Sequence, residues 1–240
     1  MNVFSYAHSA WNNSIPTPQM TKMPNIKSIS FYALLFITLT LFSCKRDKKE
    51  YYIDGTLKSM QSYKGKTPEG SSVWYYPNGK KELEINYKNG KEQGEVRRWY
   101  FNGNKESVEN FINGRKSGVS YNWDQEGRLV DEKNYINDTL NGPYIKYHPN
   151  GNIMIEGNYN KGLFDGKWTY FNEFGLIIGE GNFTSGNGIQ KAFHPDGSIW
   201  VETPYKNNLR HGIEKQYSSK GELKKETYFT NDRIEKVVNH

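Results

Sequence analysis

Residues 142–166 read GPYIKYHPNGNIMIEGNYNKGLFDG, and the glycines that open and close this stretch lie 24 residues apart. The same spacing runs through most of the chain, with one shortened repeat of 22 residues before Gly188. The first glycines of the seven copies are Gly70, Gly94, Gly118, Gly142, Gly166, Gly188 and Gly212. A fixed period of this length indicates one supersecondary unit that repeats and buries its apolar side chains by stacking on its neighbours.

Each repeat has the composition of two strands joined by a turn. If the first glycine is position 0, position 9 is also glycine in every copy, usually after Asn or Asp as in Asn150-Gly151. Positions 5 and 17 are aromatic in all seven copies, and position 11 is Leu or Ile in five. Aromatic and β-branched residues between Asn-Gly turns predict a strand, a turn and a strand, so we expect an all-β chain.

The turn sequence also predicts which side chains share a face. Tyr76-Pro77-Asn78-Gly79 favours a type I turn closed by a glycine bulge, with Pro fixing φ and Gly adopting the left-handed conformation. In that register positions 5, 11, 13, 15 and 17 lie on one face, which we expect to be buried. Even positions are expected on the opposite, exposed face. Glycines at position 15, Gly157 and Gly181, would let the sheet pack closely beneath the rings.

The stretch 156–168, EGNYNKGLFDGKW, resembles the consensus of the MORN repeat, in the bacterial variant often described as antitoxin-like. The resemblance covers about residues 51–238. Ile155 stands where that repeat has tyrosine, and the repeat that begins at Gly166 is short. The resemblance implies an elongated, single-layer antiparallel meander of MORN-type β-hairpin repeats, about seven units of 24 residues, and it does not imply an enzyme.

The N-terminal residues have the pattern of an export signal. Residues 29–42 are apolar, follow Lys22 and Lys27, and contain no acidic residue. Such a stretch is typical of a signal peptide and is shorter than the roughly 20 residues that cross a bilayer. We interpret residues 20–44 as a lipoprotein-type signal peptide and residues 1–19 as an upstream extension or mis-start, with initiation at Met20 or Met23.

Cys44 is the single cysteine of the chain and ends this segment. Leu41-Phe42-Ser43-Cys44 resembles the bacterial lipobox, in which the cysteine is acylated, although Phe42 is larger than the usual residue. A plain signal peptide with an incidental cysteine is the alternative. We expect acylation at Cys44, a charged tether over 45–50 and a repeat array over 51–240. The protein would then be held by acyl chains at a membrane of the bacterial cell envelope, as an outer-membrane, periplasmic or surface lipoprotein.

The charge pattern and the motifs favour a binding protein over an enzyme. The net charge of +6 includes two lysines of the leader, and acidic and basic residues alternate afterwards, so we expect no nucleic-acid partner. The chain has no Gly-x-Ser-x-Gly, phosphate-loop or paired-histidine motif. His148, His194 and His211 fall at turn positions. We therefore expect no catalytic site, no metal site and no cofactor.

Glutamate recurs at position 14, in six of the seven copies. Equivalent residues of successive hairpins are two strands apart, about 9.5 Å, which is too far for one cation to bridge two carboxylates. We interpret these glutamates as a solvated row paired with lysines such as Lys191 and Lys215. The members are Glu84, Glu132, Glu156, Glu180, Glu202 and Glu226.

Aromatic residues at even positions differ between copies, so we interpret them as a candidate binding face. The residues are Trp74, Tyr76, Tyr100, Tyr144, Trp168, Tyr170 and Trp200. Stabilisation of a single-layer sheet is the alternative role. Together these patterns predict a non-enzymatic, envelope-anchored scaffold for an unknown protein or glycan partner. A toxin-neutralising, immunity-like protein and a glycan- or lipid-headgroup-binding module remain alternatives.

Overall fold

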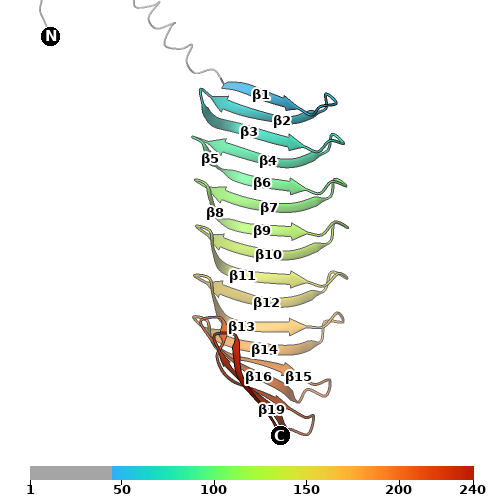
Figure 1. The fold of residues 1–240 in the computed structure, drawn as a ribbon, viewed down its shortest axis with the longest axis vertical. Helices are drawn as coiled ribbons and strands as arrows, with labels where there is room; N and C mark the ends of the chain where they lie inside the picture. Colours follow the sequence, from blue (N-terminus) through green and yellow to red (C-terminus); the bar gives the residue numbers. More distant parts are fainter. Residues whose placement is uncertain (1–44) are drawn as a thin grey trace, which may run out of the picture. The chain divides into compact units, whose positions relative to one another are not determined.

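The computed structural model describes residues 45–240, which form one open antiparallel sheet of 20 strands in a meander. Consecutive hairpins stack side by side, and the last strands curl back at the C-terminal end (Figure 1). The all-β class and the meander predicted from the repeats are confirmed. The expected signal segment 20–44, the upstream residues 1–19 and Cys44 lie outside the described residues. Within residues 45–240, no helix is long and apolar enough to cross a membrane.

The strands are β1 (Lys45–Tyr51), β2 (Leu57–Lys64), β3 (Thr67–Tyr75), β4 (Lys81–Lys88), β5 (Lys91–Glu92), β6 (Gly94–Trp99), β7 (Lys105–Ile112), β8 (Arg115–Lys116), β9 (Gly118–Trp123), β10 (Leu129–Ile136), β11 (Thr139–Tyr147), β12 (Ile153–Asn160), β13 (Leu163–Phe171), β14 (Ile177–Thr184), β15 (Asn187–Phe193), β16 (Ile199–Lys206), β17 (Leu209–Arg210), β18 (Gly212–Tyr217), β19 (Leu223–Thr230) and β20 (Arg233–Asn239). The two-residue strands β5, β8 and β17 each pair with the same neighbour as the strand that follows them: β5 and β6 with β4, β8 and β9 with β7, and β17 and β18 with β16.

The hairpin tips have the predicted turn. At the first tip of the glycine series, the Gly79 N–H donates to the Tyr76 carbonyl oxygen, and Gly79 has a φ of +80°. This is a type I turn closed by a glycine bulge. The opposite edge of the sheet has two-residue turns in which both residues have positive φ, as at Asn89 (φ 52°) and Gly90 (φ 75°). Asn and Gly tolerate this conformation, which matches the twist of paired strands.

The predicted division of the two faces is wrong at positions 5 and 11, which lie opposite each other on the same face. Tyr75 pairs with Lys81, whereas the preceding Trp74 pairs with Leu83, so β4 has an extra residue at this point. Such a bulge places two successive side chains on the same side. The aromatic row at position 5 therefore lies with the glutamates of position 14 on what we call the outer face. Positions 2, 4, 13, 15 and 17 form the opposite, inner face.

Residues 45–50 are not a tether. They belong to β1, which pairs antiparallel with β2 from Lys45 opposite Lys64 to Tyr51 opposite Leu57. The Ser62 hydroxyl donates to the Asp47 carboxylate at 2.6 Å across this pair. The strand escaped prediction because its sequence, KRDKKEY, has no apolar alternation. Within the described residues β1 is an edge strand, and lysine-rich sequences are common on sheet edges because they oppose unwanted strand pairing.

The two-residue turns of successive repeats are linked to one another. The Gly90 N–H donates to the Pro68 carbonyl oxygen, and the Asn89 N–H donates to the Glu69 carboxylate. The residue just before the first glycine provides the same side-chain acceptor in five later repeats: Gln93, Ser117, Asn141, Asp165 and Asn187. Because each turn satisfies donors of the next, neighbouring repeats are held in register.

The sheet curls where the repeat is shortened. The Asn208 side chain accepts from the Phe164 N–H at 2.8 Å and donates to the Gly162 carbonyl oxygen at 2.9 Å. The Asn208 side chain therefore contacts the turn two repeats earlier and passes over the turn between them, which contains Gly186. Only glycine fits at position 186, because a Cβ there would lie 2.8 Å from the Asn208 amide oxygen. Consequently the last hairpins turn back toward β13, as the ribbon shows (Figure 1).

Candidate functional site

The residues of the predicted binding face lie in three different environments. Trp74, Tyr144, Trp168 and Tyr170 lie on the inner face, together with the aromatic row of position 17. Trp168 is 3% exposed and belongs to the core. Tyr76 and Tyr100 are half-buried at hairpin tips, whereas Trp200, the unpaired bulge residue of β16, is 43% exposed. These residues therefore do not form one recognition surface.

Trp168 is the centre of an aromatic cluster. Its ring lies 4.6 Å from Phe164, 5.1 Å from Tyr159 and 5.7 Å from Tyr144, measured between centroids. It covers Gly157, where a Cβ would approach the indole to 2.2 Å, so the glycine allows this packing as predicted. Burial raises the pKa of Tyr159 to about 12. The cluster stabilises the fold, because its rings face one another and leave little of Trp168 for a ligand.

The tip residues Tyr76 and Tyr100 bind the next repeat. Their hydroxyl groups donate to the carbonyl oxygens of Trp99 and Trp123, each at 2.8 Å. The histidines at the same position act alike. His148 Nε2 lies 2.9 Å from the carbonyl oxygen of Phe171, and His194 Nε2 lies 3.1 Å from that of Tyr217. A carbonyl oxygen only accepts, so Nε2 carries the proton in both histidines. The prediction that these histidines are turn residues is confirmed.

Five of the six glutamates of position 14 bind neighbouring side chains, whereas Glu156 is exposed and has no such partner among residues 45–240. Glu202 pairs with Lys191 at 3.2 Å, as predicted, and Glu180 pairs with Lys167 at 2.8 Å. The Tyr147 hydroxyl donates to Glu132 at 2.6 Å; burial and this hydrogen bond raise the pKa of Tyr147 to about 12. Within residues 45–240, no three His, Cys, Asp or Glu side chains gather closely enough to hold a metal ion.

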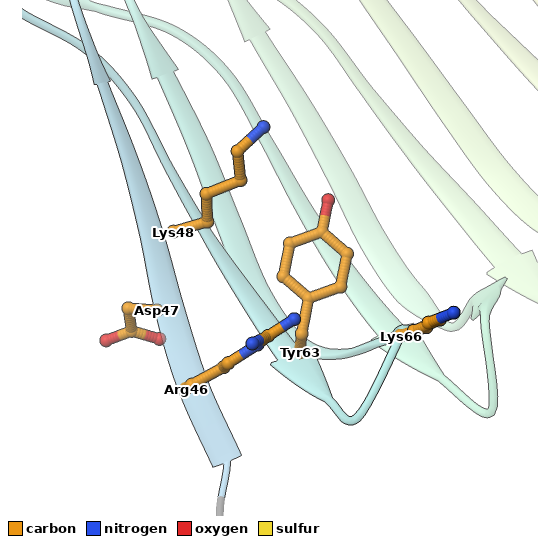
Figure 2. Close-up of a pocket in the computed structure, with 5 residues that line it drawn as sticks. All are labelled: Arg46, Asp47, Lys48, Tyr63 and Lys66. Carbon is orange, nitrogen blue, oxygen red and sulfur yellow. The ribbon is translucent and has the colours of Figure 1, made fainter.

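A first surface that departs from the repeat pattern is the N-terminal hairpin. Arg46, Lys48 and Lys66 line a hollow of about 530 Å³ together with Asp47 and Tyr63. Figure 2 shows Arg46, Lys48 and Tyr63 on the same side of the β1–β2 pair, with the Asp47 carboxylate on the other side. We call the hairpin with its seven cations the basic end; they are Lys45, Arg46, Lys48, Lys49, Lys58, Lys64 and Lys66.

A second surface is the tip of the β13–β14 hairpin, with the sequence Phe174-Gly175-Leu176-Ile177-Ile178. Phe174 is 78% exposed and Leu176 is 64% exposed. A hollow of about 390 Å³ lies beside this tip, lined by Ile153, Phe171 and Phe174 with the backbone of the neighbouring β11–β12 tip. Exposed apolar groups at the rim of a hollow are typical of a recognition surface. We call residues 174–178 the apolar tip.

Neither surface was among the predicted site residues, although both leave a signal in the sequence. The apolar tip has Phe174 at position 8, where Asn78, Asn102 and Asn150 occupy other copies. These asparagines donate to backbone carbonyl oxygens of the next tip, and phenylalanine has no group that could do so. The basic end is visible as a local excess of lysine and arginine. Averaging charge over the whole chain hid it.

Comparison with known proteins agrees with the repeat architecture. Five segments match a family model described as the MORN repeat variant: residues 68–89, 92–113, 140–161, 187–207 and 210–231. The basic end and the apolar tip both lie outside these segments. No curated protein matches the chain.

Among solved structures, a crystal structure titled TcdB2-TccC3 aligns with 82% of this chain and 16% of its own chain, at 12% identity and a TM-score of 0.20. This chain therefore spans about a sixth of that protein, and a score so low supports no argument about fold or function. The assignment of the repeats rests on the strand pairing and on the family match. Residues 45–240 are an array of β-hairpin repeats, five of which match the MORN repeat variant.

Proposed function

We propose that the protein is a non-enzymatic, envelope-anchored repeat scaffold that binds a protein partner through its apolar tip. The observation that carries this proposal is Phe174, which is 78% exposed beside a hollow lined by Ile153 and Phe171. An apolar side chain of a partner inserted there would cover all three residues. Aromatic side chains that border such pockets commonly dominate the binding energy of protein interfaces.

The roles of the polar side chains support binding rather than catalysis. His148 and His194 are engaged with backbone carbonyl oxygens of the next repeat. The Glu132 and Glu202 carboxylates accept from tyrosine hydroxyl groups or pair with lysine. A general base or nucleophile needs a partner positioned at a site that also accommodates a substrate. These groups instead join one repeat to another, which is the requirement of a scaffold.

Attachment to the membrane is the second part of the proposal and depends on acylation of Cys44. The apolar residues 29–42 and the lipobox-like Leu41-Phe42-Ser43-Cys44 support it. Substituting Cys44→Ser should move the protein from the detergent-extracted membrane fraction to the soluble fraction. Equal membrane association of wild type and variant would disprove acyl anchoring.

Partner binding is tested with Phe174→Asn, which installs the residue that three other tips carry at the same position. Phe101→Gln is the matched control, because Phe101 is an exposed ring, 58% accessible, at another tip, and Gln125 occupies its position in the next repeat. We expect an envelope partner recovered with the wild type to bind Phe174→Asn about 30-fold more weakly, the loss typical of a binding hot spot. Binding of that partner by Phe174→Asn and Phe101→Gln alike would refute the apolar tip as the site.

Trp200 supports the alternative of glycan binding. Its side chain is 43% exposed, and its ring lies 6.2 Å from the imidazole of His194. An exposed indole can stack on a sugar ring. Trp200→Ser should abolish retention on an immobilised envelope polysaccharide if this alternative is correct, whereas Phe174→Asn should leave retention unchanged.

A further inference from the structure

The whole net charge of the described chain resides in its first hairpin. Residues 45–67 contain seven Lys or Arg and three Asp or Glu, a net charge of +4. Residues 68–240 contain 23 basic and 23 acidic residues, a net charge of zero. The array is therefore electrically asymmetric, with one basic end and a long neutral remainder.

The cations of the basic end are available to an external anion. All seven are exposed. Of these seven side chains, only Lys48 forms an ion pair within the described residues, with Glu50 at 2.8 Å. The remaining acids serve the hairpin itself: Asp47 accepts from the Ser62 hydroxyl, and Asp54 accepts from the Thr56 N–H. The local acids thus leave a clear positive excess on this hairpin.

The arrangement of these cations favours an extended surface over a small ligand. Successive side chains of a strand point to opposite faces, so Arg46 and Lys48 lie on the inner face while Lys45 and Lys49 lie on the outer face. A small anion in the hollow of Figure 2 would meet only the inner set. A flat anionic surface that meets the edge of β1 would face both sets, because this edge has no neighbouring strand within the described residues.

We propose that the basic end rests on the headgroups of anionic phospholipids, with the edge of β1 toward the membrane. This inference builds on the proposed acylation of Cys44. One Cα–Cα step of about 3.8 Å separates Cys44 from Lys45, so an acylated Cys44 would bring β1 into the headgroup region. Acyl chains and a group of basic residues reinforce each other in membrane binding, and each lysine or arginine near an anionic surface strengthens binding about fivefold.

The experiment measures partitioning of the full chain into two kinds of vesicle, phosphatidylcholine alone and phosphatidylcholine with about 30% phosphatidylglycerol. The quantity compared is the ratio of the two partition coefficients. The acyl chains enter both vesicles, so their contribution largely cancels in the ratio. We expect a ratio well above one for the wild type that falls steeply when NaCl rises from about 50 to 500 mM, because salt screens the attraction.

The test variant carries Arg46→Gln, Lys49→Gln and Lys66→Gln, which spares the Lys48–Glu50 pair. The control variant carries Lys206→Gln, Lys220→Gln and Lys225→Gln, an equal charge change in the C-terminal hairpins. We expect the ratio to fall at least tenfold in the first variant and less than twofold in the second, with unchanged thermal midpoints in both.

Equal ratios in wild type and test variant, or equal losses in both variants, would overturn the proposal. The ratio is independent of the fractionation of Cys44→Ser, so failure of acylation and failure of the basic end are distinguishable. If Cys44→Ser loses membrane anchoring but the charge variants have no effect, acyl anchoring is supported and the proposed role of the basic end is rejected. A retained ratio in Cys44→Ser would support the basic end alone.

Discussion

The N-terminal and C-terminal hairpins share one backbone repeat but fill their inner faces differently. In the N-terminal half the fully buried inner positions are occupied mainly by serines: Ser59, Ser72, Ser107 and Ser120. In the C-terminal half they include three large rings, Trp168, Phe183 and Phe229, beside the smaller Thr203 and Thr227. The regular hairpins are held by backbone pairing and turn contacts, which serine does not disturb. The curled hairpins enclose enough volume to form an aromatic core.

The largest expected difference between the two regions concerns position 2. Trp168→Ala should lower the free energy of unfolding by about 3–5 kcal/mol, because it empties a buried site surrounded by three rings. Ser72→Ala, at the same position of the first repeat, should change it by about 1 kcal/mol or less. Chemical denaturation of both variants provides the comparison. Similar losses would show that the two inner faces are equivalent.

The next effect concerns the contact that curls the sheet. Asn208→Gly should cost about 1–3 kcal/mol, because two hydrogen bonds to the β13 turn are lost while the positive φ is kept. Asp138→Gly is the control in the regular region, where one bond from the Lys116 N–H is lost. We expect roughly half the cost there. Amide hydrogen exchange at Phe164 should accelerate only in Asn208→Gly, and unaltered exchange would argue that other contacts maintain the curl.

A smaller effect is expected at the hairpin tips. Tyr76→Phe removes the hydroxyl group that donates to the carbonyl oxygen of Trp99 and should cost about 0.5–1.5 kcal/mol. Tyr228→Phe removes an exposed hydroxyl group near Glu226, at 3.3 Å, and should cost less. Thermal unfolding of both variants tests this order. A larger loss in Tyr228→Phe would mean that the bonds between tips do not stabilise the array.

The smallest expected effect is a dependence of stability on alkaline pH. Burial and the bond to Glu132 raise the pKa of Tyr147 from about 10 to about 12. Between these values the unfolded chain loses the phenolic proton before the folded chain does, so stability decreases as pH rises through this window. Tyr147→Phe should flatten the decrease in urea midpoints measured between pH 10 and 12. An equally steep decrease would indicate that other tyrosines, such as Tyr159, dominate it.

Each of the two candidate surfaces lies in a different one of these two regions. The basic end belongs to the first hairpin, and the apolar tip belongs to the repeat where the curl begins. Both lie outside the segments that match the repeat family. Residues 172–176 illustrate the change, because Asn172 caps its own turn by accepting from the Phe174 and Leu176 N–H groups. A tip that caps itself does not require the asparagine at position 8, and an apolar residue there becomes tolerable.

By itself the sequence determined the repeat, the hairpins and the turn types, because glycines in the left-handed conformation and Asn-Gly pairs have few alternatives. It also determined the excess of charge in residues 45–67. Tertiary structure decided the faces, since the extra residue opposite Tyr75 changes the alternation and no residue type marks its place. It also placed Trp168 in the core, where the rings of Tyr144, Tyr159 and Phe164 surround it. It produced the curl as well, in which the Phe164 N–H donates to the side chain of Asn208, 44 residues away. Local periodicity contains no information about a contact of that range.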